Sequence, residues 1–207
     1  MQGFKSKIQI VFCLLVIVVV TIGARWAFLR FYRAAYPIRY SELVVEESKR
    51  NALPPSLVYA VIRTESGFNP DAVSSVEARG LMQITGETLA WALYRENDPP
   101  LEEEALHDTA VNIRYGAVIL RLHLGEFGSV ENALCAYHAG RSNLLKWLNS
   151  SESSLDGSTL YRIPFADTAY YVNRVLDTQR IYQRLYHLES LVNLKEASKW
   201  AARRKKS

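Results

Sequence analysis

The sequence predicts a mainly α-helical domain preceded by one membrane-spanning helix. Apolar residues recur at helical spacing from about residue 40 onward, and no convincing run alternates apolar and polar residues as a half-buried strand does. Near the N-terminus, residues 8–24 carry no charge and are mostly aliphatic. Because 207 residues with 49 % hydrophobic content suffice for one packed core, we expect a single compact domain with terminal segments.

The uncharged N-terminal stretch is predicted to be a membrane anchor. The residues from 8 to 24 alone would span only about 25 Å as a helix, the short end of the range for a bilayer crossing. If Arg25 snorkels, the apolar run extends to residue 29, which gives an anchor over 8–29 between a basic N-terminus (1–7) and a juxtamembrane linker (30–40). A cleaved signal peptide is the alternative, but no small-x-small site follows the run.

The domain itself reads as a series of helices in chain order. Pro54-Pro55-Ser56 marks the start of one helix, since proline is favoured in the first helical turn. Apolar residues at helical spacing predict further helices within residues 111–122, 130–137 and 171–185. Residues 149–164 are rich in serine and contain an Asp-Gly pair and a proline, which predicts a surface loop.

The net charge of +4 belongs to the two ends of the chain. Residues 1–40 hold six basic residues and no acid, and residues 195–207 carry a net charge of +5, which leaves −7 for residues 41–194. A nucleic-acid-binding protein needs a basic face on the fold itself, so we predict no nucleic acid partner. The basic tail (191–207) is interpreted either as a contact with anionic wall polymers or membrane, or as a solvated helix end.

Glu65 is a candidate catalytic acid on position alone. It lies four residues after Val61 and three after Ile62, which puts it on the apolar face of its helix. Gly67 and Pro70 follow closely and place it at the helix end, beside a loop. A carboxyl among apolar neighbours at a cleft edge has a raised pKa, which suits a general acid near neutral pH. An exposed glutamate in a last helical turn is the alternative.

Several sequence blocks around and after Glu65 occur in a specific order and spacing. They are Glu65-Ser-Gly-Phe-Asn-Pro70, Ala78-Arg-Gly-Leu-Met-Gln83, Ala136-Tyr-His-Ala-Gly140, Ile163-Pro-Phe165 and Tyr171-Val-Asn-Arg-Val175. Together they resemble the catalytic domain of soluble lytic transglycosylases, which has a goose-type lysozyme-like fold. The resemblance covers roughly residues 40–188, and we assign a catalytic domain to residues 41–190.

The resemblance implies an enzyme that acts on peptidoglycan glycan strands without a cofactor or a metal. Enzymes of this family cleave the β-1,4 bond between N-acetylmuramic acid and N-acetylglucosamine and leave a 1,6-anhydro end. Glu65 matches their single acid/base. Ordinary glycosidases need a second carboxylate, but here the muramyl 6-hydroxyl is held close to the reacting carbon, and proximity replaces the second group.

The resemblance also assigns substrate contacts. Ser74 and Gln83 match positions that hydrogen-bond the sugar next to the scissile bond. Tyr171 matches a tyrosine that positions the catalytic carboxyl, with core packing as its alternative. Tyr137 and Met82 resemble groove-lining residues, although for Met82 a place in the core is equally compatible with the pattern.

This sequence departs from the family pattern at several positions. His138 stands where the family usually has asparagine, so it is a substrate-contact candidate that adds a titratable group near the groove. Glu77 replaces a common glycine. The segment Asp167-Thr-Ala169 replaces a usual Glu-Thr-Arg, which removes a basic residue ahead of the tyrosine at 171.

Two other functions compete with the transglycosylase interpretation. One is a muramidase on the same fold that uses water, and the other is a non-catalytic glycan-binding component of an envelope assembly. The arginines after the apolar run favour the opposite orientation under the positive-inside rule. We nevertheless expect a single-pass protein with its domain outside the cell membrane, because the implied substrate lies there. The sequence names no protein partner.

Overall fold

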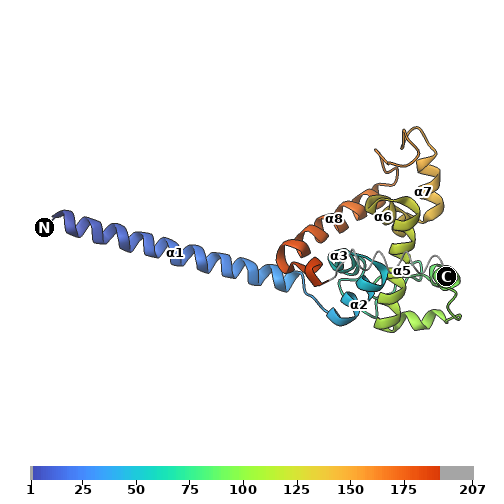
Figure 1. The fold of residues 1–207 in the computed structure, drawn as a ribbon, viewed down its shortest axis with the longest axis horizontal. Coiled ribbons are helices and arrows are strands. Elements are labelled where there is room, and N and C mark those ends of the chain that lie inside the picture. The colour runs from blue at the N-terminus through green and yellow to red at the C-terminus, as the bar shows by residue number, and fades with distance from the viewer. Residues whose placement is uncertain (1, 192–207) are drawn as a thin grey trace. The chain divides into compact units, whose positions relative to one another are not determined.

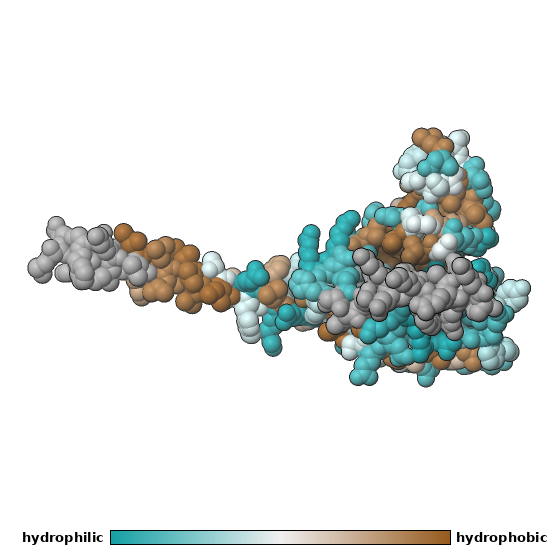
Figure 2. All heavy atoms as spheres, in the orientation of Figure 1, coloured by the Kyte–Doolittle hydropathy of each residue, from teal (hydrophilic) through white to brown (hydrophobic). Residues whose placement is uncertain are grey.

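The structure, a computed structural model, describes residues 2–191, and the chain divides into two compact units at Pro37–Ile38. The first unit is one long helix, α1 (Gln2–Ala35) (Figure 1). Its part from Phe12 to Ala35 is long and apolar enough to cross a membrane, and none of it is buried in protein. Figure 2 shows a hydrophobic surface on the middle part of this helix, followed by hydrophilic and hydrophobic side chains together in its last turns.

The helix runs further than the predicted anchor. The expected linker begins at residue 30, yet the backbone stays helical through Ala35. No glycine or proline interrupts this stretch, and the residue before Pro37 is disfavoured in helical conformation. The first six residues of the predicted linker are therefore an extension of α1, and the chain leaves the helix only where proline requires it.

The second unit is built of helices, as predicted. Its elements are α2 (Ser41–Asn51), α3 (Pro55–Glu65), α4 (Gly86–Glu96), η1 (Glu103–His107), α5 (Thr109–Phe127), α6 (Val130–Ala139), α7 (Arg141–Leu148), α8 (Ala166–Tyr186) and η2 (Leu188–Leu191). Within residues 2–191 the only β-pairing consists of isolated bridges. The predicted helix start at Pro55 is confirmed, and the serine-rich segment 149–164 is a loop. The basic tail at residues 192–207 lies outside the described residues.

The core is assembled around α3, which packs most extensively against α8, while α5 packs against α2 and α6 (Figure 1). The apolar stripe of α3 is fully buried, with Val61 and Ile62 at 0 % exposure. Across the α3–α8 contact, the rings of Tyr59 and Tyr182 stack with centroids 5.2 Å apart. This contact brings the C-terminal end of α3, at Glu65, to the N-terminal half of α8.

The loop between α3 and α4 folds back onto the domain. Gly67 and Phe68 both adopt left-handed backbone angles, with φ of 60° and 69°, and turn the chain away from the helix. The Phe68 side chain is then buried at 2 % exposure beside Tyr59. Two isolated antiparallel bridges pair Arg79 with residues 73 and 84, and these bridges make the loop compact.

Candidate active site

Glu65 is the last residue of α3, and its neighbour ties the helix end to the following loop. The Ser66 hydroxyl lies 2.8 Å from the Leu81 carbonyl oxygen, to which it donates, and 3.2 Å from the carbonyl of Ile62. The Ser66 backbone N–H also closes the last turn of the helix. The backbone at Glu65 is thus held from two sides, by the buried stripe of α3 and by the loop that carries Gln83.

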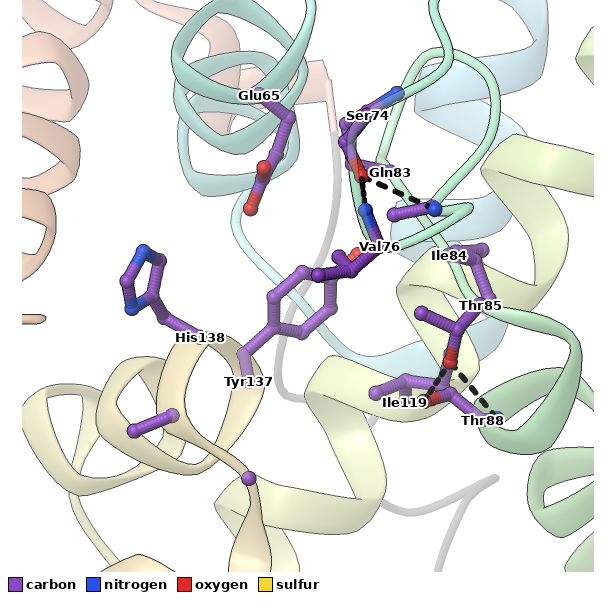
Figure 3. A pocket seen from close by; sticks show the side chains of 13 residues that line it. Glu65, Ser74, Val76, Gln83, Ile84, Thr85, Thr88, Ile119, Tyr137 and His138 are labelled. Atoms are coloured by element: carbon purple, nitrogen blue, oxygen red, sulfur yellow. Dashed lines mark hydrogen bonds between the residues drawn. The ribbon is translucent and has the colours of Figure 1, made fainter.

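The Glu65 carboxyl faces a cavity of about 420 Å³, which we call the acid cavity (Figure 3). Five of the predicted site residues line it: Glu65, Ser74, Gln83, Tyr137 and His138. Thr85 and Thr88, from the start of α4, add hydroxyl groups to the wall. The cavity combines hydrogen-bonding side chains with a few apolar ones, as expected of a site for a polar ligand. Among its described lining residues, Glu65 is the only carboxylic acid.

Burial raises the pKa of Glu65 to about 7, and an interaction with the Tyr171 hydroxyl lowers it in part. The Tyr171 hydroxyl is buried and makes no hydrogen bond of ordinary geometry, and burial of the carboxyl is the larger influence on its pKa. The net effect leaves the acid protonated in a large fraction of molecules at neutral pH. A carboxyl of this pKa can donate a proton and then act as a base at the same pH.

Tyr171 and His138 form a stacked pair beside the acid. Their ring centroids lie 4.4 Å apart with planes inclined by 30°. The His138 Nδ1 atom lies 3.1 Å from the hydroxyl of Thr168, which is buried in the first turn of α8. Partial burial lowers the pKa of His138, while the charge of Asp167 opposes that effect. Tyr171 itself is buried and does not line the acid cavity, so the structure brings it to His138 and Glu65 but not into the cavity wall.

Ser74 and Gln83 each use part of their hydrogen-bonding capacity to shape the loop. The Ser74 hydroxyl oxygen accepts from the backbone N–H groups of Val76 (3.3 Å) and Ala78 (3.1 Å), as the dashed lines in Figure 3 show. The Gln83 amide nitrogen donates to the carbonyl oxygens of Ala72 and Gly80, both at 3.0 Å. The serine hydroxyl hydrogen and the glutamine carbonyl oxygen keep the capacity to donate to and accept from a ligand.

The expectation that Met82 lines the groove is wrong for its side chain. Met82 is fully buried at 0 % exposure and packs against Gly116, where an added Cβ would lie 2.2 Å from the methionine sulfur. The side chain therefore fills the core, as the alternative interpretation held. Its backbone carbonyl does serve the site, because it accepts the Tyr137 hydroxyl at 2.7 Å. This bond fixes the ring of Tyr137 in the cavity wall.

Asn112, in α5, was missed by the sequence analysis. Its Nδ2 donates to the carbonyl oxygens of Arg79 (2.9 Å) and Leu106 (2.8 Å), and its Oδ1 accepts from the backbone N–H of Met82 (2.7 Å). The side chain is fully buried, and Gly80 passes so close that a Cβ there would lie 2.2 Å from Nδ2. The only sequence signal was an amide between the apolar residues Val111 and Ile113. Asn112 holds the backbone that leads into Gln83.

The fold and the acid cavity together define a helical domain of the lytic-transglycosylase kind. The chain belongs to the family described as the transglycosylase SLT domain, whose model matches residues 42–158.

Relatives within this family include both soluble and membrane-bound proteins. The chain is 30 % identical over 171 residues to a soluble lytic murein transglycosylase of Escherichia coli, a match that covers 81 % of this chain and 26 % of the relative. It is 27 % identical to membrane-bound lytic murein transglycosylase C of Edwardsiella ictaluri, over 71 % of this chain and 47 % of that protein. The chain thus spans about a quarter of the soluble relative and about half of the membrane-bound one.

A solved structure shares the fold. The lytic transglycosylase Slt of Pseudomonas aeruginosa, determined as an inactive mutant, superimposes with a TM-score of 0.64 at 30 % sequence identity. The match covers 76 % of this chain and 26 % of that one. The predicted fold class, mainly helical and similar to soluble lytic transglycosylases, is confirmed.

Proposed function

We propose that the protein is a membrane-anchored lytic murein transglycosylase that cleaves the β-1,4 bond between N-acetylmuramic acid and N-acetylglucosamine. The observation that carries the proposal is the carboxyl of Glu65, which has a pKa of about 7 and faces a polar cavity in an SLT-family domain. A glycosidic oxygen needs a proton before it can leave, and an acid of this pKa supplies one near neutral pH.

Glu65 acts twice in the proposed reaction. The protonated carboxyl first donates its proton to the glycosidic oxygen, and the bond from that oxygen to the muramyl C1 breaks. The resulting carboxylate then takes the proton of the muramyl 6-hydroxyl, whose oxygen bonds to C1 and closes the 1,6-anhydro ring. The second step returns Glu65 to its acid form, and no water is consumed.

The other cavity residues bind and orient the sugar in this scheme. The Ser74 hydroxyl donates to a sugar oxygen, and the Gln83 carbonyl oxygen accepts from a hydroxyl or acetamido N–H. Tyr137 offers the face of a ring held by its bond to a backbone carbonyl. Such contacts bring the 6-hydroxyl to C1 and thereby convert the ring closure into an intramolecular step.

A muramidase on the same fold is less well supported. Hydrolysis needs a second carboxylate that activates water or acts as a nucleophile. Glu65 is the only acid among the described residues that line the acid cavity, and Asp167 belongs to a separate cavity beyond His138. A purely glycan-binding role gives no reason to retain an acid at a partly desolvated position, where its charged form is costly.

We further propose that α1 anchors the protein in the cell membrane as a single span with the SLT domain on the outer side. The helix is long and apolar enough for this role, and a membrane-bound lytic transglycosylase is among the relatives. Fusions of reporter enzymes after residue 40 test the orientation: activity of a periplasmic reporter supports it, and activity of a cytoplasmic reporter contradicts it.

Digestion of purified peptidoglycan by the detergent-solubilised chain tests the reaction. Mass spectrometry distinguishes anhydro-ended products from hydrated ones, because they differ by one water. Anhydro ends support the proposal, hydrated ends support the muramidase, and bound glycan without products supports the binding role. Glu65→Gln is the matched control, and cleavage at full rate by this variant overturns the assignment of the acid.

A further inference from the structure

The last turns of α1 differ in composition from the rest of the helix. Residues 8–24 are uncharged, whereas residues 25–35 contain three arginines and four aromatic residues, and no acid occurs in the first 40 positions. In Figure 2 hydrophilic and hydrophobic side chains lie together in these turns. Because the backbone stays helical through Ala35, the positions of these side chains around the helix axis are fixed.

The arginines of this segment lie on one side of the helix. At about 100° per residue, Arg25, Arg30 and Arg33 fall within an arc of about 140° and are spread over about 12 Å along the axis. All three residues are exposed, and we call this surface the arginine face. Trp26 lies within the same arc at 64 % exposure, and the Arg30 guanidinium sits over its ring, 5.6 Å from the centroid. This cation–π contact orients the guanidinium beside the indole.

Aromatic side chains occupy the opposite side of the same turns. Phe28, Phe31 and Tyr32 fall within about 100° of one another and outside the arc of the arginine face. The Tyr32 ring centroid lies 4.4 Å from that of Phe28 and 5.9 Å from that of Phe31. Phe28 and Phe31 nevertheless remain more than half exposed. Aromatic rings are enriched where hydrocarbon meets headgroups, so this segment has the composition of an interfacial helix end.

The chemistry of the arginine face fits phosphate groups. A guanidinium presents a planar fork of N–H donors that forms paired hydrogen bonds with phosphate oxygens. Three such groups on one helix side attract anionic headgroups, and α1 contains no acid that would repel them. A zwitterionic headgroup carries its own cation beside the phosphate, so its net attraction to the arginine face is weaker.

We propose that the arginine face of α1 binds the phosphate groups of anionic phospholipids. This inference rests on the proposed membrane anchor, but neither on the proposed reaction nor on the side of the membrane that carries the SLT domain. Headgroup contacts stabilise an arginine-rich helix end at either surface, including the outer one that the positive-inside rule disfavours. The consequence is a shell of selected lipids around this end of the anchor.

Electron spin resonance of the full chain in vesicles of equimolar phosphatidylcholine and phosphatidylglycerol tests the proposal. Spin-labelled lipids with either headgroup report which lipid is immobilised at the protein surface. We expect the phosphatidylglycerol label to be selected over the phosphatidylcholine label by about threefold to tenfold. High salt should reduce this selection, because it screens exposed charges.

Three triple variants assign the selection to the arginine face. The combination of Arg25→Gln, Arg30→Gln and Arg33→Gln should select the two lipids equally. Lysine at the same three positions keeps the charge but lacks the planar fork, so it should keep part of the selection. The matched control removes the same charge from exposed positions of the SLT domain and should leave the selection unchanged; it combines Arg162→Gln, Arg174→Gln and Arg180→Gln.

The outcomes separate this inference from the membrane anchor. Alkaline carbonate treatment of floated vesicles shows whether the wild type and each variant are inserted. A wild-type chain that stays in the bilayer but selects no phosphatidylglycerol overturns the inference and leaves the anchor standing. A wild-type chain that is washed out overturns the anchor and this inference with it. Full selection by the inserted glutamine variant, or equal loss in the domain control, shows that the arginine face is not the lipid site.

Discussion

The hydroxyl of Ser66 donates to the carbonyl oxygen of Leu81 at 2.8 Å, across a loop of fifteen positions. Ser66 directly follows Glu65, and Leu81 lies two residues before Gln83. One hydrogen bond therefore connects the helix end that carries Glu65 to the loop that carries Gln83, a predicted sugar-binding residue. We expect the relative placement of Glu65 and Gln83 to depend on it.

Substitution of Ser66 by alanine should loosen that placement. The Leu81 carbonyl loses its hydroxyl donor, which we expect to lower the free energy of unfolding by about 1–2 kcal/mol. Because the acid and the sugar contacts then shift relative to each other, kcat should fall several-fold. Denaturant unfolding and peptidoglycan turnover measure the two effects. Ser66→Thr keeps the hydroxyl and should restore most of both, whereas equal turnover by Ser66→Ala and the wild type would contradict the role.

Glu65→Gln should stabilise the fold at alkaline pH while it abolishes turnover. The folded-state pKa of about 7 lies above the ordinary value of 4.5 because burial disfavours the charged form. The contribution of Glu65 to stability is therefore fully present below pH 4.5 and is lost as the pH rises through 7. The glutamine variant stays neutral, so its advantage should reach about 1–3 kcal/mol at pH 8 and vanish near pH 4.5.

Denaturant unfolding of both proteins at pH 4.5 and pH 8 measures this advantage. A difference in unfolding free energy that is the same at the two pH values would show that the carboxyl of Glu65 is not desolvated. Glu87→Gln, at an exposed position in the first turn of α4, is the matched control and should show no gain at pH 8.

The sequence was sufficient to predict the mainly helical fold and the position of Glu65 at a helix end, because both depend on short-range patterns. The place of Glu65 follows from its spacing to Val61 and Ile62 within one helix. The groove residues Ser74 and Gln83 came from the family resemblance, and the structure brings both to the cavity of the acid.

The core position of Met82 and the role of Asn112 depend on long-range packing and were not predictable. Met82 lies in a loop, and its side chain packs inward because Gly116, on α5, leaves space for its sulfur. The role of Asn112 rests on hydrogen bonds to three backbone groups outside its own helix, and no local sequence pattern reveals these bonds. The extent of α1 beyond residue 29 follows from the absence of any helix breaker before Pro37, which outweighs the change from aliphatic to aromatic and basic residues.

Asn112→Ala should destabilise the loop that leads into the acid cavity. It removes the amide partner of the Leu106 carbonyl oxygen and of the Met82 N–H, and one of the two donors to the Arg79 carbonyl oxygen, which keeps its bond from the Ile84 N–H. We expect a total cost of about 3 kcal/mol. Hydrogen exchange should reveal faster opening of residues 79–83 than of α3. Asn143→Ala removes a half-buried amide that makes one bond, from α7 back to the carbonyl oxygen of Ala139 at the end of α6, and should cost less than 1 kcal/mol. Equal costs for the two variants would contradict the role of Asn112.

His123 should make the fold sensitive to acid. Burial lowers the pKa of its imidazole to about 4, its Nδ1 has no partner, and the ring stacks on Trp91 at 5.3 Å. An unfolded chain binds the proton near pH 6.5, whereas the folded chain resists it to about pH 4. The stability that His123 provides is therefore present above pH 6.5 and is lost as the pH falls toward 4, by about 3 kcal/mol in total.

His123→Phe keeps the stack but cannot titrate, so its unfolding free energy should fall less than that of the wild type between pH 7 and pH 4. Parallel curves for the two proteins over this interval would refute the assignment, because the groups that titrate elsewhere, including Glu65, are common to both.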